Sequence, residues 1–443
     1  MIRDYSKSGL SVFQWLIFFF VNSVAIPIVV GGIFHLSATE VTHLMQRTFL
    51  VVGLSTFLQG WIGHRMPIMD GPAGTWLGVF VIMGNMAVHK GHSFSDTLQI
   101  LEGGMIIAGL MLFILGITGM IKRILTLFTP LVTGVFLFLL SIQLSGVFLK
   151  GMMNVNDISG KPDVIAFIIA FGVFLIIVGL SFWGRGWLRT FSLLIGISAG
   201  WLVFYLVGKG SPSPVSKEWI RIPEIFAWGY PRLDSGMALS ALILAFMLVS
   251  NLVSNISAMG NVLSDGETKK KDFNRASSFA GITQILCSLF SVVGIVPLNS
   301  SVGYVRMTGQ RCLRPFLIAS IFLTGIALIP AIINFLSLLP APIANAAMLA
   351  TFVQSVGVAL LSITKERLDE RRLTILGLTL LFGIGVMFLP PAVFQGLPSI
   401  IQYVCGNGLL VGTMIVIIME QVWVKKKEKP VKHQTNQNST NIS

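Results

Sequence analysis

The chain has 443 residues, of which 54% are hydrophobic and only 11% are charged, and its formal net charge is +13. Average soluble domains are about half apolar and about a quarter charged, so this composition excludes a soluble globular protein. The apolar stretches also run too far along the chain for a cleaved signal peptide or a single anchor. The sequence therefore predicts a polytopic membrane protein whose excess of Lys and Arg reflects topology instead of nucleic-acid binding.

Counting about 20 apolar residues per crossing predicts fourteen membrane segments in an all-α fold. They cover residues 12–34, 46–63, 67–88, 103–121, 125–147, 163–183, 190–208, 237–263, 276–296, 298–305 with a short continuation, 315–336, 342–364, 373–389 and 397–423. We expect one transmembrane domain over residues 1–424 and a disordered tail over residues 425–443, which is polar throughout.

The basic residues predict the orientation of these segments. With an even number of segments, 23 of the 31 Lys and Arg fall on the side of the termini and 8 on the other side. Because cytoplasmic loops are enriched in Lys and Arg, we expect both termini, and the tail, to be cytoplasmic in a plasma (inner) membrane.

Two pairs of Pro-containing interruptions suggest an internal repeat. Residues Pro67–Gly74 in the third segment match Pro297–Gly303 at the tenth, and Leu127–Gly134 in the fifth match Leu339–Asn345 in the twelfth. Seven segments separate both pairs, and an odd offset requires inverted repeats, here about 12–208 and 237–423. Interrupted segments of this kind form substrate sites in transporters. The alternative is that Pro and Gly are simply common in membrane helices.

The Cys and His residues show no pattern typical of a cofactor or disulfide site. Cys287, Cys312 and Cys405 are isolated, and none of the six His lies in the middle of a segment. We therefore expect no metal and no cofactor.

Asp70 is the one carboxylate among eighteen Asp and Glu that we place well inside a membrane segment; Glu102, Asp234 and Glu420 are expected at segment ends. Asp70 follows Arg65, at the predicted cytoplasmic edge, by five residues. An extended chain would carry it roughly 16 Å inward and a helix only about 8 Å. Burial at the greater depth disfavours the charged form and suits a proton-coupling residue. The alternative is a shallow Asp70 paired with Arg65 or His64.

A set of short motifs resembles the nucleobase–ascorbate transporters, also called the nucleobase:cation symporter-2 family, which includes uracil, xanthine and uric acid permeases. The motifs cover nearly the whole chain, and they are Gln14 with Ala25–Gly31, Pro67 with Gly71, Pro130–Gly134, Leu194–Gly196 with Gly200, Phe226–Pro231, and Gly303 with Thr308–Gly309. The resemblance implies fourteen segments in two inverted seven-segment repeats, a core and a gate domain, and a possible homodimer. It also implies that segments three and ten are each a short strand followed by a half-helix, with the base bound between them.

The chain departs from the family at several binding positions. Gln14 precedes Trp15 where relatives have His, and Asn251 stands where they carry a segment-eight Glu. Residues 280–284 offer no carboxylate, and Ser300–Ser301 replace Gln-Asn or Glu-Asn.

A nucleobase is a flat ring edged with donors and acceptors, so its site needs fixed polar partners and a stacking surface. Asn251 and Asn255 lie four residues apart, on one helix face. Ser300, Ser301 and Gly303 would open a half-helix whose positive end favours an electron-rich edge. The further expected substrate contacts are Asp70, Gly71, Gln14 and the aromatic ring of Trp76. The alternatives are helix-to-helix hydrogen bonds for the amides and close packing for the small residues.

These observations predict a secondary active transporter that imports a nucleobase, with a purine preferred, by proton symport and alternating access. Two alternatives keep the same fold: a transporter of an anion, and an uncoupled nucleobase facilitator. A membrane enzyme is the least favoured, because no paired carboxylates, His–carboxylate set or metal set falls within one segment. We therefore expect a small nucleobase, protons and the lipid bilayer as partners, and no nucleic acid.

Overall fold

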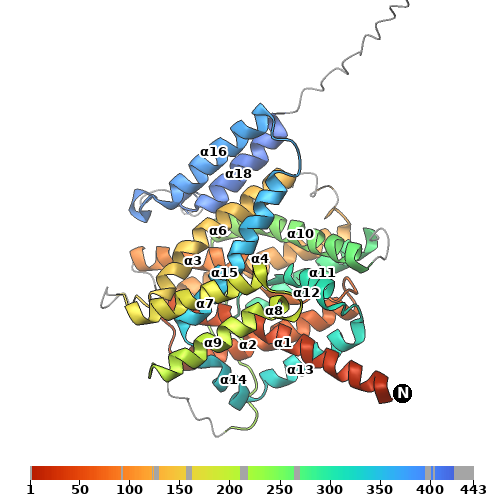
Figure 1. The fold of residues 1–443 in the computed structure, drawn as a ribbon. Helices are drawn as coiled ribbons and strands as arrows, with labels where there is room; N and C mark the ends of the chain where they lie inside the picture. The colour runs from red at the N-terminus through yellow and green to blue at the C-terminus, as the bar shows by residue number, and fades with distance from the viewer. Residues whose placement is uncertain are drawn as a thin grey trace, which may run out of the picture.

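A computed structural model describes residues 2–90, 93–121, 123, 129–155, 162–209, 218–263, 270–394, 401–402 and 405–423. The expected tail over residues 425–443 and the first residues of the Leu127–Gly134 motif lie outside these ranges. Within them the chain is almost entirely helical, with one pair of short strands (Figure 1).

The elements, in chain order, are α1 (Ile2–Ile33), α2 (Ala38–Trp61), β1 (Asp70–Pro72), α3 (Gly74–Lys90), α4 (Phe94–Thr118), α6 (Pro130–Met152), α7 (Val164–Trp183), α8 (Trp187–Thr190), α9 (Ser192–Leu206), α10 (Ser235–Leu263), α11 (Lys270–Leu289), β2 (Ile295–Pro297), α12 (Ser300–Thr308), α13 (Leu313–Ala327), α14 (Pro330–Ser337), α15 (Ala341–Ile363), α16 (Glu370–Met387), the 3₁₀ helix η1 (Pro391–Phe394) and α18 (Gly408–Val422).

Several of these helices are long and apolar enough to cross a membrane. In the described part of the chain, α1, α4, α6, α7, α10 and α15 meet this description, and α13 with α14 forms a further pair bent by 89°. Shorter apolar helices occur in α3, α9 and α18. The protein is therefore a multi-pass membrane protein, as its composition predicts.

The expected interruptions correspond to two different kinds of structure. Pro67–Gly74 and Pro297–Gly303 are true breaks, because each contains extended backbone followed by the start of a short helix. The second pair marks the beginnings of helices instead. α6 begins at Pro130 and α15 begins directly after Pro340, as expected from the preference of Pro for the first helical turn.

Close helix pairs hold the bundle together. α4 packs along α11, α2 along α13, and α6 along α15, while α16 and α18 lie side by side at one end of the molecule (Figure 1). Gly281 of α11 approaches α4 so closely that a Cβ there would lie 2.5 Å from the Gly109 carbonyl oxygen. Gly134 of α6 similarly faces the Ala359 carbonyl of α15. Small residues at such contacts let helix backbones approach one another, as is common in membrane bundles.

Replacing Gly281 by Ala tests the tight contact between α4 and α11. The added methyl group would also lie 2.6 Å from the backbone nitrogen of Phe113, and overpacking of this kind costs about 1–3 kcal/mol. We expect Gly281→Ala to lower the unfolding temperature of the purified protein, measured by loss of its gel-filtration peak after heating. The control is Gly357→Ala on α15, where a Cβ would meet nothing within 4 Å. Equal unfolding temperatures for the two variants would contradict the close packing.

Candidate functional site

The two interruptions meet as an antiparallel strand pair. Asp70 lies opposite Pro297, Gly71 opposite Val296 and Pro72 opposite Ile295. Further backbone hydrogen bonds extend the pairing at both ends, from the Ala73 N–H to the Gly294 carbonyl (3.0 Å) and from the Leu298 N–H to the Met69 carbonyl (2.8 Å). α3 and α12 therefore begin at opposite ends of the strand pair, with their positive N-terminal ends directed toward it.

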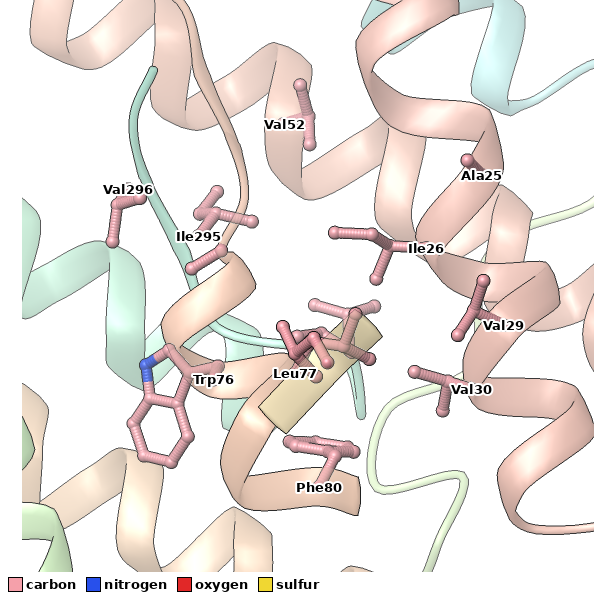
Figure 2. Packing of buried hydrophobic residues seen from close by; sticks show 14 of the residues in the cluster. Ala25, Ile26, Val29, Val30, Val52, Trp76, Leu77, Phe80, Ile295 and Val296 are labelled. Atoms are coloured by element: carbon pink, nitrogen blue, oxygen red, sulfur yellow. The ribbon is translucent and has the colours of Figure 1, made fainter. Parts of the chain in front are cut away.

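All six residues of the two strands are buried. Side chains of α1, α2, α10 and α11 surround them. Figure 2 shows Ile26, Val29 and Val30 of α1 pointing toward Leu77 and Phe80 of α3. This packing excludes water, so the outer edges of the strand pair need hydrogen-bond partners from the protein itself.

Polar side chains from four helices provide those partners. The hydroxyl of Thr56 on α2 accepts from the Asp70 N–H (3.1 Å) and donates to the Asp70 carbonyl (3.2 Å). The amide of Gln284 on α11 donates to the Ile295 carbonyl (2.6 Å), and that of Asn255 on α10 donates to the Pro297 carbonyl (2.9 Å). Ser301 on α12 accepts from the N–H of Met69, just before β1 (3.0 Å). These bonds satisfy outward-facing backbone groups of Met69, Asp70, Ile295 and Pro297 without water.

Asp70 is deeply buried, with only 1% of its surface exposed. The Ser55 hydroxyl of α2 donates to Oδ2 at 2.5 Å, and that hydroxyl also lies 2.8 Å from Thr283 Oγ1 of α11. Oδ1 has no hydrogen-bond partner among the described residues. The chain between Arg65 and Asp70 is not helical, and the Asp70 carboxylate bonds to Ser55 and not to Arg65 or His64.

The two amides expected on one face of α10 do lie together. Asn255 is buried, and its Nδ2 donates to Asn251 Oδ1 (2.6 Å) as well as to Pro297. Asn251 is only half-buried. Asn255 therefore joins α10 to β2, while Asn251 extends the same hydrogen-bonded chain toward a more open position.

The expected residues of α12 divide in the same way. Ser301 is fully buried and holds Met69, whereas Ser300 and Gly303 are exposed on the other face of the first turn. Ser300 donates to the Asn22 side chain of α1 at 3.3 Å. Gly71 is buried, and a Cβ there would lie 2.5 Å from Leu298, so its missing side chain allows the chain after β2 to pack closely.

Gln14 and Trp76 have other contacts in the structure. Gln14 accepts a hydrogen bond from Gln310, beyond the C-terminal end of α12, at 2.9 Å. Trp76 is fully buried against Gly294, where a Cβ would overlap its indole ring. It would have to move before a ligand could stack on it.

Sequence reasoning missed the residues that support Asp70 and one further buried carboxylate. Ser55 and Thr56 on α2 and Thr283 on α11 are a few of the several polar residues of these helices, and no spacing links α2 with α11. Glu102, expected at a segment end, is fully buried in the third turn of α4. The apolar run in the sequence begins after Glu102, but the helix α4 itself begins at Phe94.

Replacing Asn255 by Ala tests its role in holding β2. The change would leave the buried Pro297 carbonyl without a donor, which costs about 1–3 kcal/mol. We expect Asn255→Ala to lower the unfolding temperature of the ligand-free protein in detergent. Ser254→Ala changes an exposed neighbour on the same helix and should have no effect. A thermal shift as small as that of the control would mean that Asn255 does not hold the strand.

Comparison with known proteins identifies the family. A family model described as a permease family matches residues 7–392. The chain is 28% identical over 435 residues to YwdJ of Bacillus subtilis (strain 168), a candidate purine permease, covering 95% of this chain and 97% of that protein. It is 22% identical over 420 residues to the uric acid permease PucK of the same organism, covering 94% and 95% respectively.

A solved structure shares the fold. The transmembrane domain of the cyanobacterium bicarbonate transporter BicA matches with a TM-score of 0.60 at 15% identity, over 93% of this chain and 97% of that one. The resemblance drawn from the sequence motifs is confirmed, as is the expectation of a transporter instead of an enzyme. Since the family match covers most of the chain, the protein belongs to the permease family.

Proposed function

We propose that the protein imports a nucleobase, with a purine preferred, across the plasma (inner) membrane by proton symport. The observation that carries this proposal is the pairing of β1 with β2. A buried carboxylate, two helix N-termini and the amides of α10 all lie next to this strand pair, and such an arrangement is suited to a small polar solute. The relatives named as purine and uric acid permeases support the choice of substrate.

The base would bind where α1, α10 and the N-terminal end of α12 come together. The half-buried amide of Asn251 offers both a donor and an acceptor to a lactam edge. Ser300 and Gly303 are exposed at the first turn of α12, and the Ser300 hydroxyl, which bonds to Asn22 at 3.3 Å, would exchange that partner for the base. Asn255, Ser301 and Gly71 act behind this surface by fixing the strands. Gln14 and Trp76 would contact substrate only in another conformation.

Asp70 would carry the coupling proton. Its free Oδ1 can take a proton while Ser55 remains bonded to Oδ2. Asp70 is paired with Pro297 in the strand register, and Pro297 is held by Asn255, which in turn bonds to Asn251. A change in the charge of Asp70 could therefore reach the proposed substrate contact through two hydrogen bonds and one strand pair.

The proposed architecture has fourteen segments in two inverted repeats, divided into a core and a gate domain. The packing of α4 on α11 and of α2 on α13 supports it. α4 and α11 overlap the expected segments four and nine, and α2 and α13 overlap segments two and eleven. In a seven-segment repeat, segment four corresponds to segment eleven and segment two to segment nine, so the two packed pairs are equivalent. The single domain over residues 1–424, cytoplasmic termini and a homodimer complete this proposal.

A small anion is the second candidate substrate. Its basis is that the proposed contacts Asn251, Ser300 and Gly303 include no carboxylate. Ser300 and Gly303 also lie at the positive end of α12.

Uptake measurements test the substrate and the coupling. Cells that lack their own base permeases and express this protein should accumulate radiolabelled xanthine, hypoxanthine, guanine or uric acid, and accumulation should collapse with a protonophore. For one proton per substrate, a gradient of one pH unit, about 1.4 kcal/mol, supports accumulation of about tenfold. Uracil and bicarbonate serve as comparisons. Equilibration without accumulation would indicate a facilitator, and competition by anions alone would favour the second candidate.

Replacing Asp70 by Asn tests the coupling residue. The amide keeps the size of the side chain but cannot exchange a proton, so we expect substrate exchange across the membrane to continue while proton-driven accumulation falls by about tenfold, the factor that one pH unit supports. Asp96→Asn is the control, because Asp96 forms an exposed ion pair with Arg232 and such pairs contribute little. Full accumulation by Asp70→Asn in reconstituted vesicles would exclude Asp70 as the coupling site.

A further inference from the structure

Glu102 is a second buried carboxylate that the proposed transport mechanism does not use. It lies on α4 about 12 Å from the start of the helix, and none of its surface is exposed. Ser291, after the end of α11, donates to Glu102 Oε1 at 2.6 Å. Oε2 has no hydrogen-bond partner among the residues that the structure describes. A buried carboxylate with a free oxygen is costly and needs an explanation.

A buried arginine accompanies Glu102 without bonding to it. Arg47 of α2 is only 5% exposed, and its Nε has no partner in the described part of the chain. Its charge acts on Glu102 through space, but the two side chains form no ion pair. The carboxylate is thus stabilised by a nearby charge and remains free to bind a proton.

A small cavity lies between Arg47 and the segment at residues 221–224. Its volume is about 10 Å³, close to the space that one water molecule needs. It is lined by His43, Gln46, Arg47, Arg221, Ile222 and Glu224. Arg221 and the partly exposed His43 are hydrogen-bonded at its rim, so the cavity connects the surroundings of Arg47 with polar groups near the surface.

The other elements around Glu102 contribute few competing charges. α10 has no titratable side chain along its length. The chain between α9 and α10 covers α4, with the Arg232 N–H bonded to the Gln99 carbonyl at 3.0 Å. The titratable groups in the chain before α10 include Glu224, Arg232, which is paired with Asp96, and Asp234. α11 carries Cys287, and Asp272 and Arg275 lie at its far end. His35 packs on Phe94 of α4. The side chains of Lys270, Lys271, His89 and Lys90 lie outside the described part.

α11 and the residues directly after it contact the surroundings of both Glu102 and Asp70. Ser291 bonds to Glu102, and eight residues earlier Thr283 contacts Ser55, which bonds to Asp70. α11 ends at Leu289, so Thr283 lies about 9 Å before the end of the helix. The buried hydroxyl of Ser288, in the interval from Thr283 to Ser291, has no partner among the described residues. A hydroxyl group thus lies at each end of this interval, and that of Ser288 lies between them in the sequence.

We propose that Glu102 is a second proton-binding residue, which takes a proton from the side of the segment at residues 218–234 and passes it to Asp70 during transport. This inference rests on the proposed proton symport. A proton from water binds Glu102 Oε2 and forms the neutral acid. When Asp70 receives that proton, Glu102 returns to the carboxylate, which Arg47 and the Ser291 hydroxyl stabilise. Water admitted beside α11 during the cycle bridges the remaining interval.

Infrared spectroscopy of the purified, full-length protein tests proton binding without any substrate. The carboxylic-acid band of the wild type should contain contributions from two buried acids over a titration with pH. Glu102→Gln should remove one contribution and Asp70→Asn the other, while Glu370→Gln, at an exposed position, should remove neither. Spectra of Glu102→Gln identical to those of the wild type would overturn the inference, whether or not the protein transports a base.

Transport in reconstituted vesicles tests the transfer to Asp70. We expect Glu102→Gln to retain base exchange and to lose at least fivefold in proton-driven accumulation, and Glu102→Asp, which keeps the carboxyl group, to recover part of it. Glu370→Gln should match the wild type. Unchanged accumulation by Glu102→Gln would overturn the transfer step. Absence of transport by the wild type would count against the proposed function alone, because the infrared result decides proton binding by Glu102 independently.

Discussion

An isolated pair of strands inside a membrane protein has two unpaired edges, and the need to satisfy them organises the structure around the site. No water is available to hydrogen-bond these edges, and each unsatisfied group would cost several kcal/mol. Thr56, Gln284, Asn255 and Ser301 supply the missing donors and acceptors from four different helices. The positions of α2, α10, α11 and α12 relative to one another are therefore fixed through backbone groups of only a few residues.

This requirement also separates two kinds of polar residue that look alike in the sequence. Asn255 and Ser301 are committed to the strands, whereas their neighbours Asn251 and Ser300 face more open surroundings. Each of these two helices thus carries one buried residue that binds the strand backbone and one more accessible residue that can contact a solute. The chain thus places its candidate binding groups directly on the framework that supports them.

Much of this arrangement follows from the sequence because Pro and Gly limit the backbone locally. The breaks at Pro67–Gly74 and Pro297–Gly303 were predictable from residue type, and so was the non-helical path between Arg65 and Asp70. The partners of Asp70 were not predictable, because Ser55 and Thr283 meet only through the packing of α2 on α11. The burial of Glu102 was missed for a similar reason, since a distant segment covers the first turns of α4.

The contact between Gly109 and Gly281 has a consequence for how the molecule can move. Two helices whose backbones touch cannot slide past each other without collision. We therefore expect α4 and α11 to move together as one rigid unit. The interface between α1 and α3 is different, because aliphatic side chains such as Ile26 and Leu77 meet there (Figure 2). Side-chain contacts can rearrange without a collision between backbones, so a small sliding movement costs less between α1 and α3 than between α4 and α11.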